Sequence, residues 1–240
     1  MSTNIAEARR DLAAILRWSC RLGLSEGICN HYSFALGDDR FLVNPFGYHW
    51  SELRASQILL VNYEGQVLEG DGKVEATAMF IHSQIHRGLP QARCVLHTHM
   101  PFATAIAALE EGRLEMISQN SLRFYDDVAY DDDYQGLALD SAEGIRMCKQ
   151  FGNKRVLFLA NHGVICIGGS IAGAFDDLYY LERACEVQIL AQSTQRPRKV
   201  VPADVCRLTV EQFKADDSYA HAHLAAIRRI LDRECPDYAQ

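Results

Sequence analysis

Three short strand-like segments lie close together in the first quarter of the chain. They are Tyr32–Leu36, Arg40–Asn44 and Gln57–Asn62, and they are separated by turn signals such as Gly-Asp-Asp and Asn-Pro. Two parallel strands in one sheet need a crossover connection, usually a helix, and these intervals are too short for one. The spacing therefore predicts an antiparallel or mixed sheet rather than a series of βαβ units.

Helical patterns alternate with further strands along the rest of the chain. Apolar residues recur at helical intervals in residues 4–22, 75–87, 101–109, 141–150, 171–192 and 209–231. Strand character is found at Cys94–His97, Val156–Ala160 and Val164–Ile167. Residues 112–140 show no regular pattern. We expect an α/β protein with one domain over residues 1–240, helices packed on the faces of its sheet, and a helical extension at about 200–240.

The composition excludes several classes of protein. Of the 240 residues, 48% are hydrophobic and 23% are charged, which is ordinary for a folded chain. The formal net charge of −7 argues against a nucleic-acid partner, and no apolar run approaches the roughly 20 residues that a membrane span needs. The N-terminal segment has no apolar signal-peptide core, and the eight cysteines form no CxxC pair. These features predict a cytoplasmic protein with no membrane partner.

Three histidines carry the strongest chemical signal in the chain. His97 and His99 lie two positions apart where a strand is expected to end, so both side chains point to the same side. His162 follows a second buried strand, and Gly163 after it would allow the backbone to turn sharply. Three imidazoles leave a metal ion with at least one open position, as a catalytic site requires. Ordinary packing of histidines is the alternative that the residues alone leave open.

A second pair of histidines, His82 and His86, lies four positions apart on a predicted helix. The pair lacks the intervening Glu of the metalloprotease pattern HExxH. We therefore interpret it as part of a packed or solvent-edge helix face.

Several motifs, taken in order, resemble the class II aldolase and adducin family and together cover roughly residues 5–195. They are Cys29-Asn-His-Tyr-Ser33, Asn44-Pro-Phe-Gly47, Val74-Glu-Ala76, Val95-Leu-His-Thr-His99, Ala160-Asn-His-Gly163 and the helix Asp177–Glu186. The succession of a Glu, an HxH and a His-Gly at a strand end is the most specific part of this resemblance.

The resemblance implies a three-layer αβα domain around a mixed, largely antiparallel sheet, assembled as a homotetramer with active sites at subunit interfaces. His97, His99 and His162 match the family's three metal ligands, with zinc the expected ion and Mn²⁺, Fe²⁺ or Co²⁺ as alternatives. Glu75 matches the catalytic acid/base, which can also ligate the metal in the empty site. Asn30 matches the residue that touches the anionic end of the substrate. The matching motifs place four more residues in the substrate site, His31, Phe46, Gly47 and Gln119.

Two departures from the sugar-phosphate aldolases indicate a different substrate. Lys73-Val74 precede Glu75 where those enzymes carry small hydroxyl residues, and Phe46-Gly47 replaces their Thr-Gly phosphate turn. A phosphate would therefore lose several charge-assisted hydrogen bonds here. The aromatic stretch 46–50 suits a flat or carboxylated substrate.

The family's catalytic tyrosine is replaced near Gln119, which leaves the proton donor to the leaving aldehyde unassigned. Tyr125, Tyr130 or a tyrosine of the C-terminal part are the candidates.

The expected activity is that of a metal-dependent carbon–carbon lyase, an aldolase or decarboxylase that acts through a metal-stabilised enolate. Its small-molecule substrate is expected to be a non-phosphorylated hydroxy, keto or aromatic carboxylic acid. Two alternatives remain open: an Fe(II)-dependent oxygenase at the same three histidines, and a non-catalytic interaction domain like the adducins.

Overall fold

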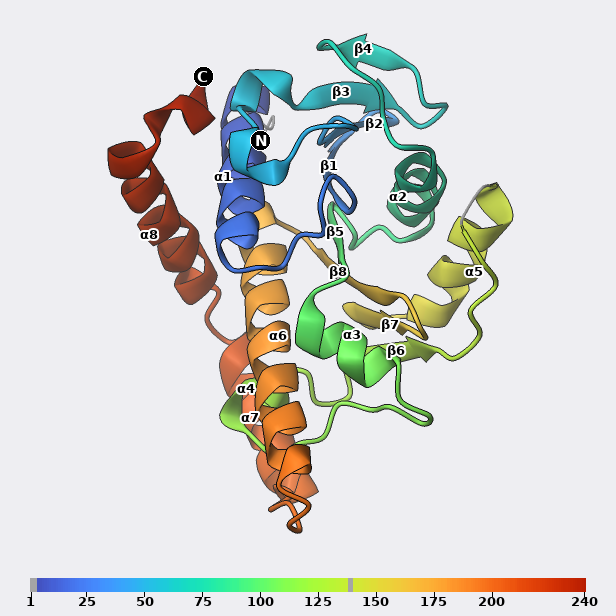
Figure 1. Ribbon diagram of the computed structural model, residues 1–240, viewed down its shortest axis with the longest axis vertical. Coiled ribbons are helices and arrows are strands. Elements are labelled where there is room, and N and C mark those ends of the chain that lie inside the picture. Colours follow the sequence, from blue (N-terminus) through green and yellow to red (C-terminus); the bar gives the residue numbers. More distant parts are fainter. Residues whose placement is uncertain (1–3, 138–139) are drawn as a thin grey trace.

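The strand-forming segments pair into one eight-stranded mixed sheet in the computed structural model, which describes residues 4–137 and 140–240 (Figure 1). The strands are β1 (His31–Gly37), β2 (Arg40–Val43), β3 (Leu59–Asn62), β4 (Val67–Glu69), β5 (Cys94–Thr98), β6 (Val128–Asp131), β7 (Val156–Leu159) and β8 (Gly163–Gly168). Their order in the sheet is β4-β3-β2-β1-β5-β8-β7-β6. All neighbours are antiparallel except the pair β6 and β7. The predicted mixed, largely antiparallel sheet is confirmed.

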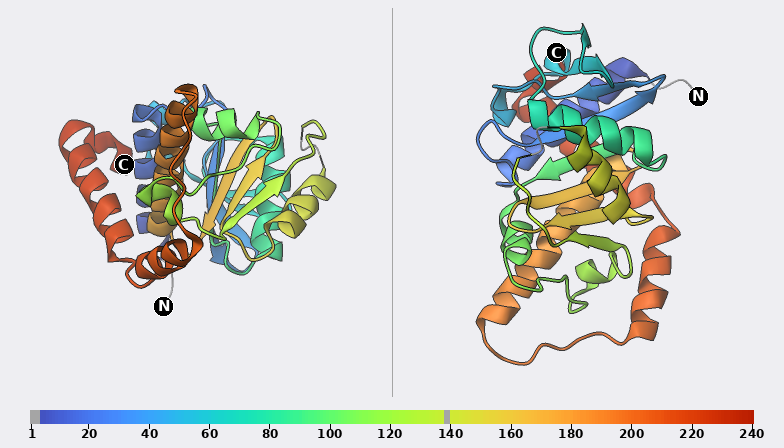
Figure 2. Two further views of the ribbon diagram at one scale, coloured as in Figure 1. Left: turned by 90° about the horizontal axis from the view of Figure 1, so that it is seen from below. Right: turned by 90° about the vertical axis from the view of Figure 1, so that its right-hand side faces the viewer.

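Helices cover both faces of this sheet, which gives the predicted three layers (Figure 2). One face packs against α1 (Ile5–Arg21), α3 (Pro101–Ala107) and α6 (Ile171–Ser193), and α8 (Ser218–Glu234) packs outside α1 and α6. The other face packs against α2 (Ala76–Gly88) and α5 (Ser141–Phe151). Two further helices, α4 (Gln119–Leu122) and α7 (Ala203–Lys214), contact each other.

Side chains of the central strands alternate between these two layers, as the period of a strand requires. Leu96 and Phe158 join the larger apolar core beneath α1 and α6. Val95 and Ile165 join the smaller core beneath α2 and α5. His97, two positions after Val95, therefore lies on the α2 face of the sheet.

The predicted helix near 209–231 is wrong, because the chain forms two helices there. The Asp216 carboxylate accepts a hydrogen bond from the backbone N–H of Ser218 at 2.9 Å, which starts a new helix after α7 has ended at Lys214. The segment 112–140, expected to be irregular, contains α4 and β6, and the short edge strand β4 was also missed.

Residues 1–3 and 138–139 lie outside the described residues. The predicted domain 1–240 includes all five of them, the N-terminal segment interpreted as lacking a signal peptide includes 1–3, and the segment 112–140 includes 138–139. Within residues 4–137 and 140–240, no helix combines the length and the apolar composition of a membrane-spanning segment.

Candidate metal centre

His97 and His99 reach the candidate site from the end of a central strand. His97 is the penultimate residue of β5 and lies opposite His31 of β1 and Ile165 of β8. The residue is only 2% exposed. β5 ends at Thr98, and α3 begins at Pro101, whose missing N–H is tolerated at a helix start. The strand therefore delivers both imidazoles to one side, as the HxH spacing predicts.

His162 arrives on the tight turn between β7 and β8. Asn161 adopts the left-handed conformation with φ +56°, and its N–H donates to the carbonyl of Ala107 at 3.1 Å. Gly163 was expected to allow a sharp backbone turn, but its φ is not positive, so a glycine is needed here for a different reason. A Cβ on Gly163 would lie 2.5 Å from the Thr98 carbonyl oxygen, so the glycine allows this turn to approach the end of β5.

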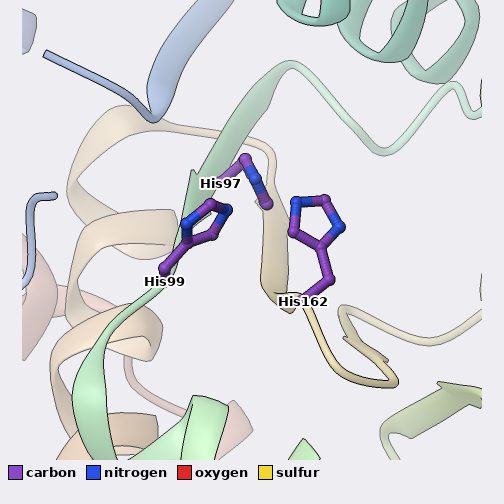
Figure 3. A group of neighbouring side chains, drawn as sticks. All are labelled: His97, His99 and His162. Carbon is purple, nitrogen blue, oxygen red and sulfur yellow. The ribbon is translucent and has the colours of Figure 1, made fainter. Parts of the chain in front are cut away.

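The three imidazoles converge on one point (Figure 3). One ligand atom from each of His97, His99 and His162 lies within 4.8 Å of the other two. The Nδ1–H of His97 donates to the Val164 carbonyl at 3.0 Å, and the Nδ1–H of His99 donates to the Glu26 carboxylate. Both rings therefore hold their protons on Nδ1 and keep Nε2 unprotonated for a ligand.

The chemistry of this group suits a divalent metal ion. His99 Nε2 is buried and has no hydrogen-bond partner among the described residues. Burial, reinforced by the charge of His162, lowers the pKa of His97, and burial lowers the pKa of His162 to about 4. Metal ions bind the neutral imidazole, so these shifts keep His97 and His162 in the binding form at neutral pH.

Glu75 lies beside the group rather than in it. Its Oε2 accepts from the N–H of Ala78 at 2.9 Å and from the hydroxyl of Thr77, so it caps α2. The same oxygen lies 4.0 Å from His31 Nε2, and the His31 ring lies 4.9 Å from that of His97, measured between centroids. Among the described residues, Glu75 does not join the three histidines as a fourth ligand.

Asn30 presents a buried amide next to His99. It has the positive φ of +74°, which Asn tolerates better than most residues, and it is 4% exposed. Its Oδ1 accepts from the N–H of His99 at 3.5 Å, whereas its Nδ2 finds no acceptor in the described part of the chain. An unpaired buried donor is costly, so this amide has an N–H free to donate to an acceptor that the described residues do not supply.

The two segments that depart from the sugar-phosphate aldolases lie against each other. The N–H of Phe46 donates to the Lys73 carbonyl at 2.8 Å, so this amide is not available to a phosphate. Phe46 is 48% exposed as a residue, and Gly47 turns the chain with φ +88°.

Gln119 is not brought to the histidines within this chain. It is an exposed residue at the start of α4, and α4 packs against α6 and α7. The predicted role of Gln119 in the substrate site stays a prediction.

Sequence reasoning missed two residues that contact the histidines. Glu26 holds His99, but it lies in a loop without a recognisable pattern. The ring of Tyr134 lies 6.3 Å from that of His162, whereas Tyr130 is engaged elsewhere, where its hydroxyl accepts from the N–H of Leu114 at 3.0 Å. Tyr134 was not among the candidates that the sequence suggested.

Comparison with known proteins assigns the family. A model of the class II aldolase and adducin N-terminal domain matches residues 10–189. The chain belongs to this family, as its motifs predicted. An aldolase II superfamily protein from Pseudomonas syringae has a similar structure, with a TM-score of 0.91 and 34% identity over 100% of this chain and 98% of that chain.

Two curated relatives carry functional names. The decarboxylase NovR of Streptomyces niveus is 30% identical over 228 residues, which are 92% of this chain and 84% of that protein. The 4-hydroxy-3-prenylphenylpyruvate oxygenase/4-hydroxy-3-prenylbenzoate synthase of Streptomyces roseochromogenus subsp. oscitans is 29% identical over 92% of this chain and 82% of its own length.

Proposed function

We propose that this protein is a metal-dependent carbon–carbon lyase acting on a non-phosphorylated hydroxy, keto or aromatic carboxylic acid. The observation that carries the proposal is the convergence of three imidazoles, two of which are held by their Nδ1 atoms so that Nε2 faces the common point. A non-catalytic interaction domain has no need for such an arrangement.

In this proposal His97, His99 and His162 hold a divalent ion, with zinc as the first choice. The ion would supply Lewis acidity that stabilises negative charge on substrate oxygens. Asn30 Nδ2 donates a hydrogen bond to the carboxylate of the substrate. Glu75, held by the Ala78 N–H, accepts or returns the proton of the reacting group.

The choice of a non-phosphorylated substrate rests on the two departures from the sugar-phosphate aldolases. Phe46, which is half-exposed, pairs through its backbone N–H with the Lys73 carbonyl, and no small hydroxyl residue precedes Glu75. The decarboxylase name of one relative agrees with a carboxylic acid as substrate. The oxygenase name of another makes an Fe(II) oxygenase the second candidate.

We further propose a single domain assembled as a cytoplasmic homotetramer. A neighbouring subunit would bring Gln119 to the site, which one chain alone does not. The eight free thiols are consistent with a reducing compartment. Light scattering tests the assembly, and a monomer at working concentration would contradict it.

The deciding experiment measures the metal content of protein purified without oxygen, in the wild type, His99→Ala and the control His221→Ala, which changes an exposed histidine of α8. We expect about one ion per chain in the wild type and control and almost none in His99→Ala. The loaded protein is then incubated with hydroxy, keto and aromatic acids, with and without oxygen. Cleavage or carbon dioxide release without oxygen supports the lyase, oxygen consumption by the iron form supports the second candidate, and failure to bind any ion contradicts both.

A further inference from the structure

A continuous chain of hydrogen bonds runs behind the candidate metal centre between β1 and α2. His31 Nδ1 lies 2.7 Å from His82 Nε2, and His82 Nδ1 lies 2.5 Å from Ser33 Oγ. Ser33 Oγ lies 2.7 Å from His86 Nε2, and His86 Nδ1 lies 2.6 Å from the Ala92 carbonyl oxygen. Residues two apart on a strand and four apart on a helix each share a face, which brings these four side chains into line.

The three imidazoles in this chain of hydrogen bonds are neutral. His31, His82 and His86 are 4%, 0% and 8% exposed, and no carboxylate contacts His82 or His86 in the described structure. Burial of an unpaired charge is prohibitively costly. Burial accordingly lowers the pKa of His82, and it lowers that of His86 to about 4.

One carbonyl group then determines where every proton lies. The Ala92 oxygen can only accept, so His86 carries its proton on Nδ1 and accepts the Ser33 hydroxyl hydrogen at Nε2. Ser33 has no other hydrogen, so it accepts from the Nδ1–H of His82. His82 Nε2 is then bare and accepts from the Nδ1–H of His31. His31 is left with a bare Nε2.

This nitrogen has no donor of its own. Thr77 Oγ1 lies 3.5 Å from His31 Nε2, but its single hydrogen is donated to the Glu75 carboxylate. Glu75 Oε2 lies 4.0 Å from this nitrogen, and the side chain of Glu75 is 31% exposed whereas that of His31 is 6% exposed, so a hydroxyl group placed against the exposed side of Glu75 would lie near His31 Nε2. A buried acceptor that lacks a donor is favourable only when a ligand or water supplies one.

We propose that His31 Nε2 is a fixed hydrogen-bond acceptor that selects substrates carrying a hydroxyl group at this position. The hydrogen bonds that connect the His31 ring to the Ala92 carbonyl only fix the position of its proton. They cannot relay protons, because a backbone carbonyl at their far end cannot release or take up a proton. The inference rests on the proposed function, since it assigns a specificity to the same site. It predicts preference for a hydroxy acid over the corresponding ether, which has no hydrogen to donate.

The proton positions are measured first, on the metal-free protein. Long-range ¹⁵N–¹H spectra of histidine-labelled protein distinguish a protonated ring nitrogen from a bare one, and His31→Gln assigns the His31 signals. We expect His31, His82 and His86 all to carry their protons on Nδ1. A His31 proton on Nε2 in the wild type overturns the proposal, whatever the catalytic activity.

The specificity is tested with zinc-loaded protein and two probes, glycolate and methoxyacetate, by calorimetry. In Ser33→Ala, His82 loses the acceptor for its Nδ1–H, so its proton moves to Nε2 and that of His31 moves to Nε2 as well. We expect the preference for glycolate over methoxyacetate to fall about fivefold in this variant, in proportion to one lost hydrogen bond. Comparing the two proteins cancels the effect of the methyl group on metal binding.

Ser33→Thr keeps the hydroxyl and is expected to restore both the proton positions and the preference. An unchanged preference in Ser33→Ala, despite shifted protons, overturns the assignment of the ligand to His31. If neither acid binds to the zinc-loaded wild type, both the proposed function and the assignment of a hydroxyl ligand to His31 are contradicted. The proton positions are judged separately, by the spectra alone.

Discussion

Two groups of histidines lie on the same side of the sheet and differ in what their second nitrogen contacts. In the group of His97, His99 and His162, the Nδ1 atoms of the first two are hydrogen-bonded to other residues, and their Nε2 atoms face the point where the three rings converge (Figure 3). In the pair of His82 and His86, both nitrogens of each ring are hydrogen-bonded within the protein.

The comparison shows that residue type and spacing do not distinguish a binding group from a packing group. Both sets have favourable spacing, i, i+2 on a strand and i, i+4 on a helix, and both are largely buried. The difference is the number of nitrogens left without a partner. The pair at His82 and His86 is the packed helix face that the sequence suggested, and its hydrogen bonds leave no atom for a metal.

The largest expected effect separates the two groups by substitution. His99→Ala should abolish stoichiometric metal binding and lower activity by at least about 100-fold, because it removes a ligand. His86→Ala should keep about one ion per chain but lower the free energy of unfolding by about 2–3 kcal/mol, because Ser33 and the Ala92 carbonyl lose their partner. Metal analysis and urea unfolding of both variants measure this. Equal metal loss in the two variants would contradict the distinction.

The next effect is the response of the packed pair to acid. Burial lowers the pKa of His86 to about 4 in the folded protein, against 6.5 in the unfolded chain. The unfolded state therefore takes up the proton first, and stability that is fully present above pH 6.5 is lost as the pH falls toward 4, by about 3 kcal/mol. Urea unfolding from pH 7 to pH 4.5 should show a flatter profile for His86→Asn, whose amide can still donate to Ala92. Identical slopes would exclude His86 as the cause.

The smallest effect concerns the carboxylate that holds His99. Glu26→Ala should weaken metal affinity about tenfold, at the lower end of what such partners contribute, because Glu26 is 64% exposed and water replaces it in part. Glu26→Gln keeps an acceptor for the Nδ1–H and should lose less. Competition with a chelating dye measures both affinities. A stronger loss in Glu26→Gln than in Glu26→Ala would contradict this role.

Local patterns predicted most of the elements that build the site. The helix expected at 75–87 begins at Ala76 with Glu75 as its cap, and the strand expected at 94–97 runs to Thr98. Two of the predictions that failed are the single helix near 209–231 and the reason for Gly163, and both failures involve short-range features of the backbone. The Asp216 carboxylate accepts from the Ser218 N–H at the break between α7 and α8, and Asn161, rather than Gly163, takes the left-handed conformation in the turn before β8.

The sequence by itself determined the mixed sheet and the two-residue spacing that puts His97 and His99 on one side. It also determined that the chain belongs to the class II aldolase and adducin family. Only the tertiary structure decided which imidazole nitrogens are free to bind. The partners of His97 and His99 lie 67 and 73 residues away along the chain, and the carbonyl that orders the protons as far as His31 belongs to Ala92. Such partners depend on strand register and helix packing, so no local pattern of residues records them.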